Sequence, residues 1–155
     1  MEVTIYTDGA SRGNPGKSAS GYMIFDDKHV KIHGETVFNG IKTNNFAEYN
    51  AVILALKKAL EIFGKNCNVT LYSDSKLVVN QVLGNYKIRD KYLKIQYMEA
   101  IKLVGEFASC KLINVPRENK YISMVDKSLN ILLDKLEIEK QEDIEIKRIS
   151  QKKLM

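Results

Sequence analysis

The hydrophobic pattern of the first half of the chain changes from the two-residue period of strands to the longer period of a helix. Apolar and polar side chains alternate over residues 3–6, and the β-rich runs 20–26 and 30–38 follow. These runs predict three strands in an antiparallel meander, with a hairpin between the second and third. Over residues 44–63 the apolar positions recur with helical spacing and cover most of the surface. This pattern predicts a central, buried helix that ends at Gly64.

The second half of the chain alternates between short apolar runs and helical patterns. It predicts a strand, a short helix, a longer basic helix, a strand and a last helix, over residues 68–73, 75–83, 88–107, 108–115 and 121–136. Strands reached through helical crossovers run parallel to a neighbour, so we expect an α/β fold. Its mixed five-stranded sheet combines the meander with parallel strands and has helices on both faces. Residues 137–155 are rich in charge, and a short strand, a frayed helix and disorder are all compatible with them.

Composition and charge narrow the class of protein. The 155 residues suffice for one domain, and 45% hydrophobic with 28% charged residues is typical of a globular protein. The net charge of +5 favours a polyanionic partner. Cys67 and Cys110 lack metal-ligand spacing, which predicts free thiols in a reducing compartment. Without a long apolar run, we expect a cytoplasmic monomer that does not associate with a membrane.

Four carboxylates occupy similar places in the predicted elements. Asp8 follows the first strand at the start of a glycine-rich loop, and Asp74 follows the fourth strand. Glu48 lies in the first turn of the central helix, and Asp126 lies near the start of the last helix. If the first and fourth strands are neighbours, Asp8 and Asp74 end side by side. Such a cluster repels itself unless cations neutralise it, and its oxygen ligands favour Mg²⁺ or Mn²⁺.

Each of these acids also has a purely structural interpretation. Glu48 has the spacing of a capping box with Asn45, Asp74 could cap the following helix, and Asp126 could be a solvated acid near a helix start. A structural explanation is reasonable for any one of these acids, but it is not reasonable that structural explanations account for all of them together. His29 and His33, four residues apart, are expected on one face of a strand without a metal role.

Four motifs in this order resemble the type 1 ribonuclease H family. They are Tyr-Thr-Asp-Gly-Ala-Ser-Arg-Gly-Asn-Pro-Gly at 6–16, Thr-Asn-Asn-Phe-Ala-Glu-Tyr at 43–49, Tyr-Ser-Asp-Ser at 72–75 and Val-Pro-Arg-Glu-Asn-Lys at 115–120. The resemblance implies a ribonuclease H-like catalytic domain over residues 1–136, followed by a charged extension over 137–155. It also implies endonucleolytic hydrolysis of the RNA strand of an RNA–DNA hybrid, with two Mg²⁺ ions, or Mn²⁺, per site. The products would carry 5′-phosphate and 3′-hydroxyl ends.

The resemblance also assigns catalytic roles. Asp8, Glu48 and Asp74 match the metal-binding carboxylates of the family. Asp126 looks like the fourth, although it follows the preceding Arg at a longer spacing and after Val125 in place of the usual Ala. Many members carry a His before the last helix that helps the product leave. This chain has no His beyond position 33, and Glu118 is the nearby ionisable substitute.

Substrate contacts are expected from polar loops and from basic residues. A hybrid is recognised through its 2′-hydroxyls and phosphates rather than its bases. The chain looks like the short form of the family, without the extra basic helix, although a solvated helix face would also explain its basic run 86–94. The residues predicted to contact substrate are Ser11, Arg12, Gly13, Asn14, Thr43, Asn44, Asn45, Lys76, Lys87 and Arg89.

Two other functions are compatible with this fold. A catalytically inactive hybrid-binding or RNA-binding module would keep the fold, but a protein that only binds phosphates gains nothing from four convergent acids. Cleavage of double-stranded RNA would use the same site on another partner. Only a comparison of substrates separates this alternative from hybrid cleavage.

Overall fold

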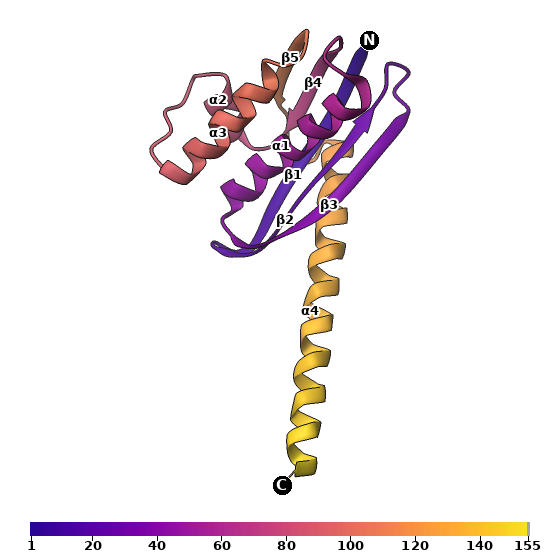
Figure 1. Cartoon of the computed structure of the whole chain (residues 1–155), viewed down its shortest axis with the longest axis vertical. Helices are drawn as coiled ribbons and strands as arrows, with labels where there is room; N and C mark the ends of the chain where they lie inside the picture. Colours follow the sequence, from indigo (N-terminus) through magenta and orange to yellow (C-terminus); the bar gives the residue numbers. More distant parts are fainter. Residues whose placement is uncertain (155) are drawn as a thin grey trace.

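The computed structural model describes the backbone of residues 1–154 and the side chains of residues 1–153. Its strands are β1 (Glu2–Gly13), β2 (Gly16–Phe25), β3 (Lys31–Lys42), β4 (Asn68–Ser73) and β5 (Ser109–Asn114). Its helices are α1 (Asn44–Phe63), α2 (Lys76–Val82), α3 (Lys91–Val104) and α4 (Lys120–Leu154). Figure 1 shows a layered domain from which α4 extends far beyond the sheet.

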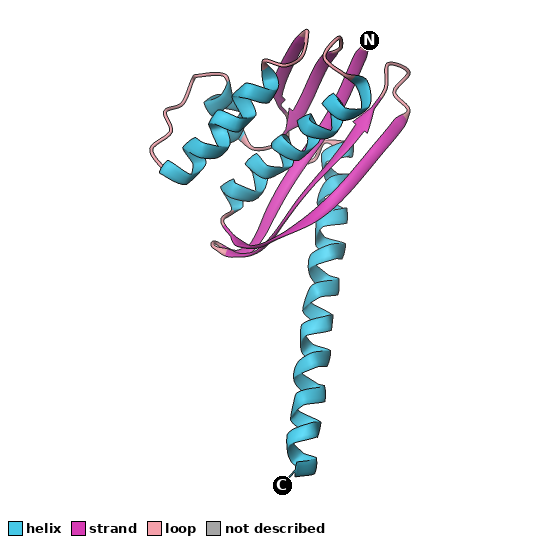
Figure 2. Ribbon diagram, viewed as in Figure 1, coloured by secondary structure: helices cyan, strands magenta, loops and turns pink. Residues whose placement is uncertain are grey.

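The five strands form one mixed sheet, which confirms the predicted architecture. Their order is β3-β2-β1-β4-β5 (Figure 2). The pairs β1–β2 and β2–β3 are antiparallel, as expected for a meander, whereas β1–β4 and β4–β5 are parallel. The crossover through α1 therefore places β4 beside β1. This pairing is the condition under which Asp8 and Asp74 were expected to meet.

Alternate residues of β1 face two different apolar layers. Val3 and Ile5 belong to the main core, together with buried side chains of α1. Tyr6 points to the other face, where it packs with Ile122 and Val125 of α4. Because neighbouring strand residues point to opposite faces, the sheet is covered by α1 on one side and by α4 on the other. This arrangement confirms helices on both faces.

Helix α1 has the predicted bounds, and the structure explains both ends. Thr43 caps its start, where its Oγ1 accepts a hydrogen bond of 3.1 Å from the Phe46 N–H. At the other end the Gly64 N–H donates to the Leu60 carbonyl, and Gly64 adopts φ 76°. A positive φ is costly for residues with a side chain, so glycine suits this helix terminus.

The first strand is longer than its hydrophobic pattern predicts. Pairing with β2 continues from Asp8–Gly21 to Gly13–Gly16, so the predicted loop is mostly strand. The prediction that Asp8 lies where the strand ends is therefore wrong. Backbone hydrogen bonds to β2 extend the strand through residues whose side chains carry no apolar alternation. Only the parallel ladder with β4 stops before Asp8, at the Thr7–Ser73 pair.

Two other local predictions also differ from the structure. Helix α3 begins at Lys91 instead of residue 88, because Asp90 caps it through the N–H groups of Tyr92 and Leu93. The histidines do not share a strand face, because His29 lies in the β2–β3 turn with φ 58°. Its ring stacks on Phe25, with 4.5 Å between centroids.

Helix α4 continues through the charged extension instead of ending near residue 136. Residues 138–153 are exposed throughout, so this part of the helix lies outside the packed domain (Figure 1). Of the three alternatives left open for residues 137–155, the frayed helix agrees most closely, although the structure shows one continuous helix of 35 residues. Within residues 1–154, no helix has an apolar stretch that is long enough to cross a membrane.

Candidate metal centre

Strand register places Asp8 beside Asp74. The parallel ladder pairs Thr7 with Ser73, and these two acids are the next residues along their chains. Asp8 is held within β1 by its pairing with Gly21 of β2, whereas Asp74 follows the last residue of β4. Two carboxylates thus meet at the point where the parallel ladder ends.

Glu48 reaches this pair because α1 begins very close to β1. The Ser20 hydroxyl donates a 2.6 Å hydrogen bond to the Ala47 carbonyl, which ties the first turn of α1 to β2. Gly9 allows the approach, since a Cβ atom there would overlap the backbone of Ala47 and Glu48. The close contact between Gly9 and α1 therefore positions Glu48 over the strand that carries Asp8.

We expect Gly9→Ala to lower the free energy of unfolding by about 3 kcal/mol or more, since the added methyl group forces α1 away from β1. The same displacement moves Glu48 away from Asp8, so we expect weaker Mg²⁺ binding as well. Urea unfolding and calorimetric Mg²⁺ titration measure the two effects. Gly105→Ala is the control, because a Cβ atom there meets only the carbonyls of Ile101 and Lys102 at 3.6 Å. Equal stability of both variants would contradict this account of Gly9.

Asp8, Glu48 and Asp74 each offer a carboxylate oxygen within 4.8 Å of the others. Glu48 Oε2 and Asp74 Oδ1 are buried and lack a hydrogen-bond partner among the described residues. The structural interpretations of Glu48 and Asp74 are wrong, because Thr43 caps α1 and Ser75 caps α2. Buried, unpaired carboxylate oxygens are costly unless a cation binds them.

The protonation of these acids reflects their burial and mutual repulsion. Burial, followed by the charge of Asp74, raises the pKa of Asp8 to about 8. Burial and then the charges of Asp8 and Asp74 raise the pKa of Glu48 well above its ordinary value. Burial also raises the pKa of Asp74, and Arg117 partly offsets this increase. The cluster therefore resists carrying its full negative charge unless a positive ion is present.

The residues present fit a hard divalent cation. Three carboxylates supply oxygen atoms and no nitrogen or sulfur ligand, which suits Mg²⁺ or Mn²⁺. The orphaned oxygens of Glu48 and Asp74 are available as ligands. Asp8 Oδ1 accepts a 3.0 Å hydrogen bond from the Gly9 N–H, which orients its carboxylate. Such support from outside the ligand set is typical of metal sites.

Asp126 lies at the same site but outside the tight cluster. It lines a cavity of about 520 Å³ together with Asp8, Glu48 and Asp74. Its charge contributes to the raised pKa values of Asp8 and Asp74. The structure thus brings all four predicted acids to one cavity, despite the unusual spacing before Asp126. The interpretation of Asp126 as an isolated solvated acid does not agree with this position.

Arg117 and Asn130 line the cavity and were missed by the sequence analysis. The Arg117 guanidinium lowers the pKa of Asp74 relative to burial alone. The sequence signal that could have identified Arg117 as a site residue is its place in the Val-Pro-Arg-Glu motif, one residue before Glu118. Glu118 is exposed in the same turn and is not among the residues that line the cavity. Its predicted role in product release stays a prediction.

The predicted substrate residues divide into three groups: those at the main cavity, those at or beside a neighbouring cavity, and basic residues outside both. Ser11, Arg12 and Asn44 line the main cavity. Asn14, Thr43 and Asn45 line a neighbouring cavity of about 410 Å³, which Tyr92 and Leu93 of α3 also border. Gly13 ends β1 beside this second group, and Asn14 Oδ1 accepts a 3.0 Å hydrogen bond from the Asn44 N–H. The hairpin turn is thereby joined to the start of α1.

The three predicted basic contacts lie farther along the chain. Lys76 is the exposed first residue of α2. Lys87 and Arg89 are exposed in the connection before α3, not on the helix where the sequence analysis placed the basic run. None of the three lines either cavity. Their contacts with a substrate stay predictions.

Comparison with known proteins identifies similar sequences. Residues 1–149 match the RNase H family. Ribonuclease HI of Halobacterium salinarum is 39% identical over 117 residues, which cover 74% of this chain and 57% of that protein. A bifunctional protein of Mycobacterium tuberculosis is 35% identical over 136 residues, which cover 86% of this chain and 36% of that protein. The similarity thus spans about a third of one relative and just over half of the other.

Solved structures show the same architecture. The crystal structure of RNase H1 from Halobacterium salinarum superposes with a TM-score of 0.81 at 32% identity, covering 87% of this chain and 99% of that chain. LC11-RNase H1, solved in complex with an RNA/DNA hybrid, gives a TM-score of 0.74 at 33% identity and covers 84% of this chain and 99% of that chain. These similarities confirm the ribonuclease H-like sheet predicted from the sequence.

Proposed function

Because this chain belongs to the RNase H family, we propose that it is a metal-dependent endonuclease that hydrolyses the RNA strand of RNA–DNA hybrids. The observation that carries the proposal is the cluster of Asp8, Glu48 and Asp74 at the wall of an open cavity. Family membership supports the nuclease activity. The neighbour solved with a hybrid supports the choice of substrate.

The chemistry follows from the charge of the site. Asp8, Glu48 and Asp74 would hold two divalent ions through carboxylate oxygens that lie within 4.8 Å of one another. When bound, the ions would supply an activated water molecule for attack on the scissile phosphate and charge stabilisation for the leaving 3′-oxygen. Asp126, on α4, which covers the face of the sheet opposite α1, would complete the set of ligands. A reaction of this type leaves 5′-phosphate and 3′-hydroxyl ends.

Positive and neutral groups around the acids would hold the nucleic acid. Arg117 lines the cavity beside Asp74 and would bind a phosphate of the RNA strand. Ser11 and Asn44 lie at the same cavity and would contact the 2′-hydroxyls, which distinguish RNA from DNA. Asn14, Thr43 and Asn45 at the neighbouring cavity would contact the DNA strand. None of these contacts requires a particular base sequence.

A comparison of substrates tests this proposal. We expect cleavage of the RNA strand of a hybrid in Mg²⁺ or Mn²⁺, and slower cleavage of double-stranded RNA, since the residues at the neighbouring cavity are proposed to contact a DNA strand. Single-stranded RNA and duplex DNA should stay intact, and excess chelator should stop the reaction. Denaturing gels of end-labelled strands measure the rates and the product ends. Tight binding without cleavage in either metal would instead identify a binding module.

A further inference from the structure

We propose that Arg12, Asn130 and Asp134, here called the hairpin clamp, position Asp126 at the metal centre. Arg12 lies near the end of β1, and the other two lie on α4. The sequence analysis assigned Arg12 to the substrate. The structure instead directs its guanidinium toward α4, so we infer a positioning role. This inference rests on the proposed function, because it concerns the placement of a metal-binding carboxylate.

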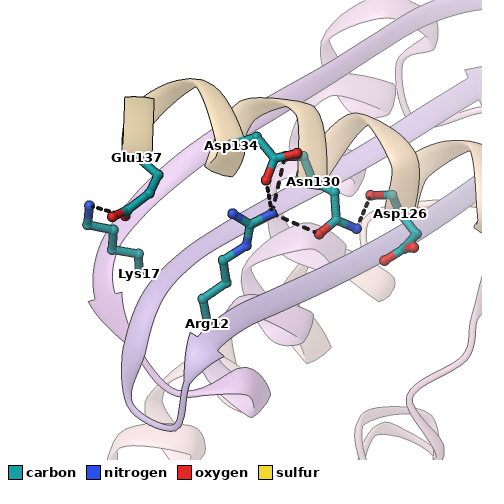
Figure 3. A network of polar contacts seen from close by, with 6 residues as sticks. All are labelled: Arg12, Lys17, Asp126, Asn130, Asp134 and Glu137. Atoms are coloured by element: carbon teal, nitrogen blue, oxygen red, sulfur yellow. Dashed lines mark hydrogen bonds and ion pairs between the residues drawn. The ribbon is translucent and has the colours of Figure 1, made fainter. Parts of the chain in front are cut away.

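The clamp connects two elements that are far apart in the sequence (Figure 3). Arg12 Nη2 forms an ion pair of 2.6 Å with Asp134 Oδ1. The same nitrogen donates to the side-chain oxygen of Asn130 at 3.2 Å and to the Asn130 carbonyl at 3.3 Å. A single guanidinium nitrogen therefore contacts three oxygen atoms on two successive turns of α4.

Asn130 continues the connection to Asp126. Its Nδ2 donates a 3.0 Å hydrogen bond to the Asp126 carbonyl, one turn earlier in the helix. Asp126, Asn130 and Asp134 are spaced by four residues and share one face of α4. Both Asp126 and Asn130 line the main cavity, whereas Asp134 is exposed. The path of contacts therefore runs from the hairpin to the backbone of the fourth acid.

Apolar packing and polar contacts hold α4 on the sheet in different ways. Ile122 and Val125 pack with Tyr6, and Leu129 and Leu133 pack against Ala19. Apolar contacts are not directional, whereas hydrogen bonds and ion pairs have narrow distance and angle requirements. The hairpin clamp adds directional contacts at Asn130, one turn from Asp126. We infer that these contacts orient the turn of α4 that carries Asp126, and with it the carboxylate of Asp126.

The exposure of the clamp separates a positioning role from a role in stability. The side chains of Arg12 and Asp134 are 40% and 62% exposed, and exposed ion pairs contribute little to stability. We therefore expect Arg12→Ala to change the melting temperature by no more than about 2 °C. Partners that orient a metal ligand typically change metal affinity or activity by 10-fold to 100-fold. The two roles thus predict effects of very different size.

The test measures metal binding and hybrid cleavage separately. For Arg12→Ala and for Asp134→Ala we expect about tenfold weaker Mn²⁺ binding by calorimetry without substrate, and about tenfold lower kcat with KM changed less than about twofold. The double variant should match Arg12→Ala, because Arg12→Ala already removes the contact with Asp134. Arg12→Lys should restore part of the loss, since it retains the ion pair with Asp134.

Lys17→Ala is the matched control. Lys17 pairs with Arg12 across the hairpin and forms its own 3.1 Å ion pair with Glu137, but it has no contact with Asn130. Lys17→Ala removes the same charge from the same hairpin as Arg12→Ala but leaves the contacts of Asn130 in place. We therefore expect its metal affinity to stay within about twofold of that of the unmodified protein. If Arg12 instead binds substrate, Arg12→Ala raises KM, and Asp134→Ala leaves metal binding unchanged. That result would overturn the proposal.

The same measurements distinguish this proposal from the proposed function. Failure of the unmodified protein to cleave any hybrid would contradict the nuclease assignment, yet the Mn²⁺ isotherms would still report on the clamp. Equal metal affinity in the unmodified protein, Arg12→Ala and Asp134→Ala would overturn the clamp even if hybrid cleavage is normal. On an Asp126→Asn background, Arg12→Ala should cause no further loss of metal affinity, because the ligand that it positions is already absent.

Discussion

The Asp74→Asn variant is expected to lose at least about 10³-fold in the rate of hybrid cleavage while it binds the hybrid almost normally. Asp74 supplies one of the three clustered carboxylates, and its Oδ1 is buried without a partner among the described residues. The amide keeps the shape of the side chain but removes the negative charge that attracts a cation. Kinetics on a labelled RNA strand measure the rate, and fluorescence anisotropy in chelator measures binding.

Asp143→Asn is the matched control for this result. Asp143 lies on the exposed part of α4 outside the packed domain, so its loss changes the net charge equally without touching the cluster. We expect its cleavage rate to stay within about twofold of the unmodified protein. If Asp74→Asn cleaved at the normal rate, the metal-dependent mechanism would be wrong for this site. If binding failed together with cleavage, Asp74 would act mainly on the substrate.

The second large effect is a loss of stability of the metal-free protein as the pH rises. Burial and the charge of Asp74 raise the pKa of Asp8 to about 8, whereas an Asp in the unfolded chain has a pKa of about 3.9. Between these values the folded protein binds more protons than the unfolded chain. The contribution of Asp8 is therefore complete below about pH 4 and is lost as the pH rises through about 8. Urea unfolding in chelator at several pH values measures this decline.

Asp8→Asn should remove much of this decline. A shift of one pKa unit corresponds to about 1.4 kcal/mol, and relaxation with water entry reduces the full penalty. We therefore expect Asp8→Asn to raise the metal-free free energy of unfolding at pH 8 by about 3 kcal/mol. At pH 4 the variant and the unmodified protein should be nearly equal. Saturating Mg²⁺ should reverse the order at pH 8, since only the unmodified protein gains binding energy.

A pH-independent stability of the metal-free protein would contradict this account of the cluster. The same outcome would remove the electrostatic reason for cation binding, because the carboxylates would then tolerate one another. A pH dependence that survives in Asp8→Asn would assign the effect to Glu48, whose pKa is also raised by burial and by its acidic neighbours. Glu48→Gln measured beside Asp8→Asn separates these two possibilities.

The element order and the residues of the candidate metal centre could be predicted from the sequence. Helix α1 has the predicted bounds, because its apolar face and its terminal Gly64 are local signals. The meander and its parallel neighbours follow from the alternation of strand and helix patterns. Asp8, Glu48 and Asp74 could be selected because their charge and the order of the motifs point to the same residues, although Asp8 lies within β1 and not at its end. The structure brings these three acids together.

Tertiary contacts decided the features that have no local signal. Pairing with β2 extends β1 through Gly13, although the residues after Asp8 lack strand periodicity. The partners of Arg12 lie more than a hundred residues away, so its contact with α4 is invisible in the local sequence. The position of Asp126 likewise depends on how α4 lies on the sheet. Backbone patterns thus determine which elements form, whereas packing between distant elements determines where their side chains meet.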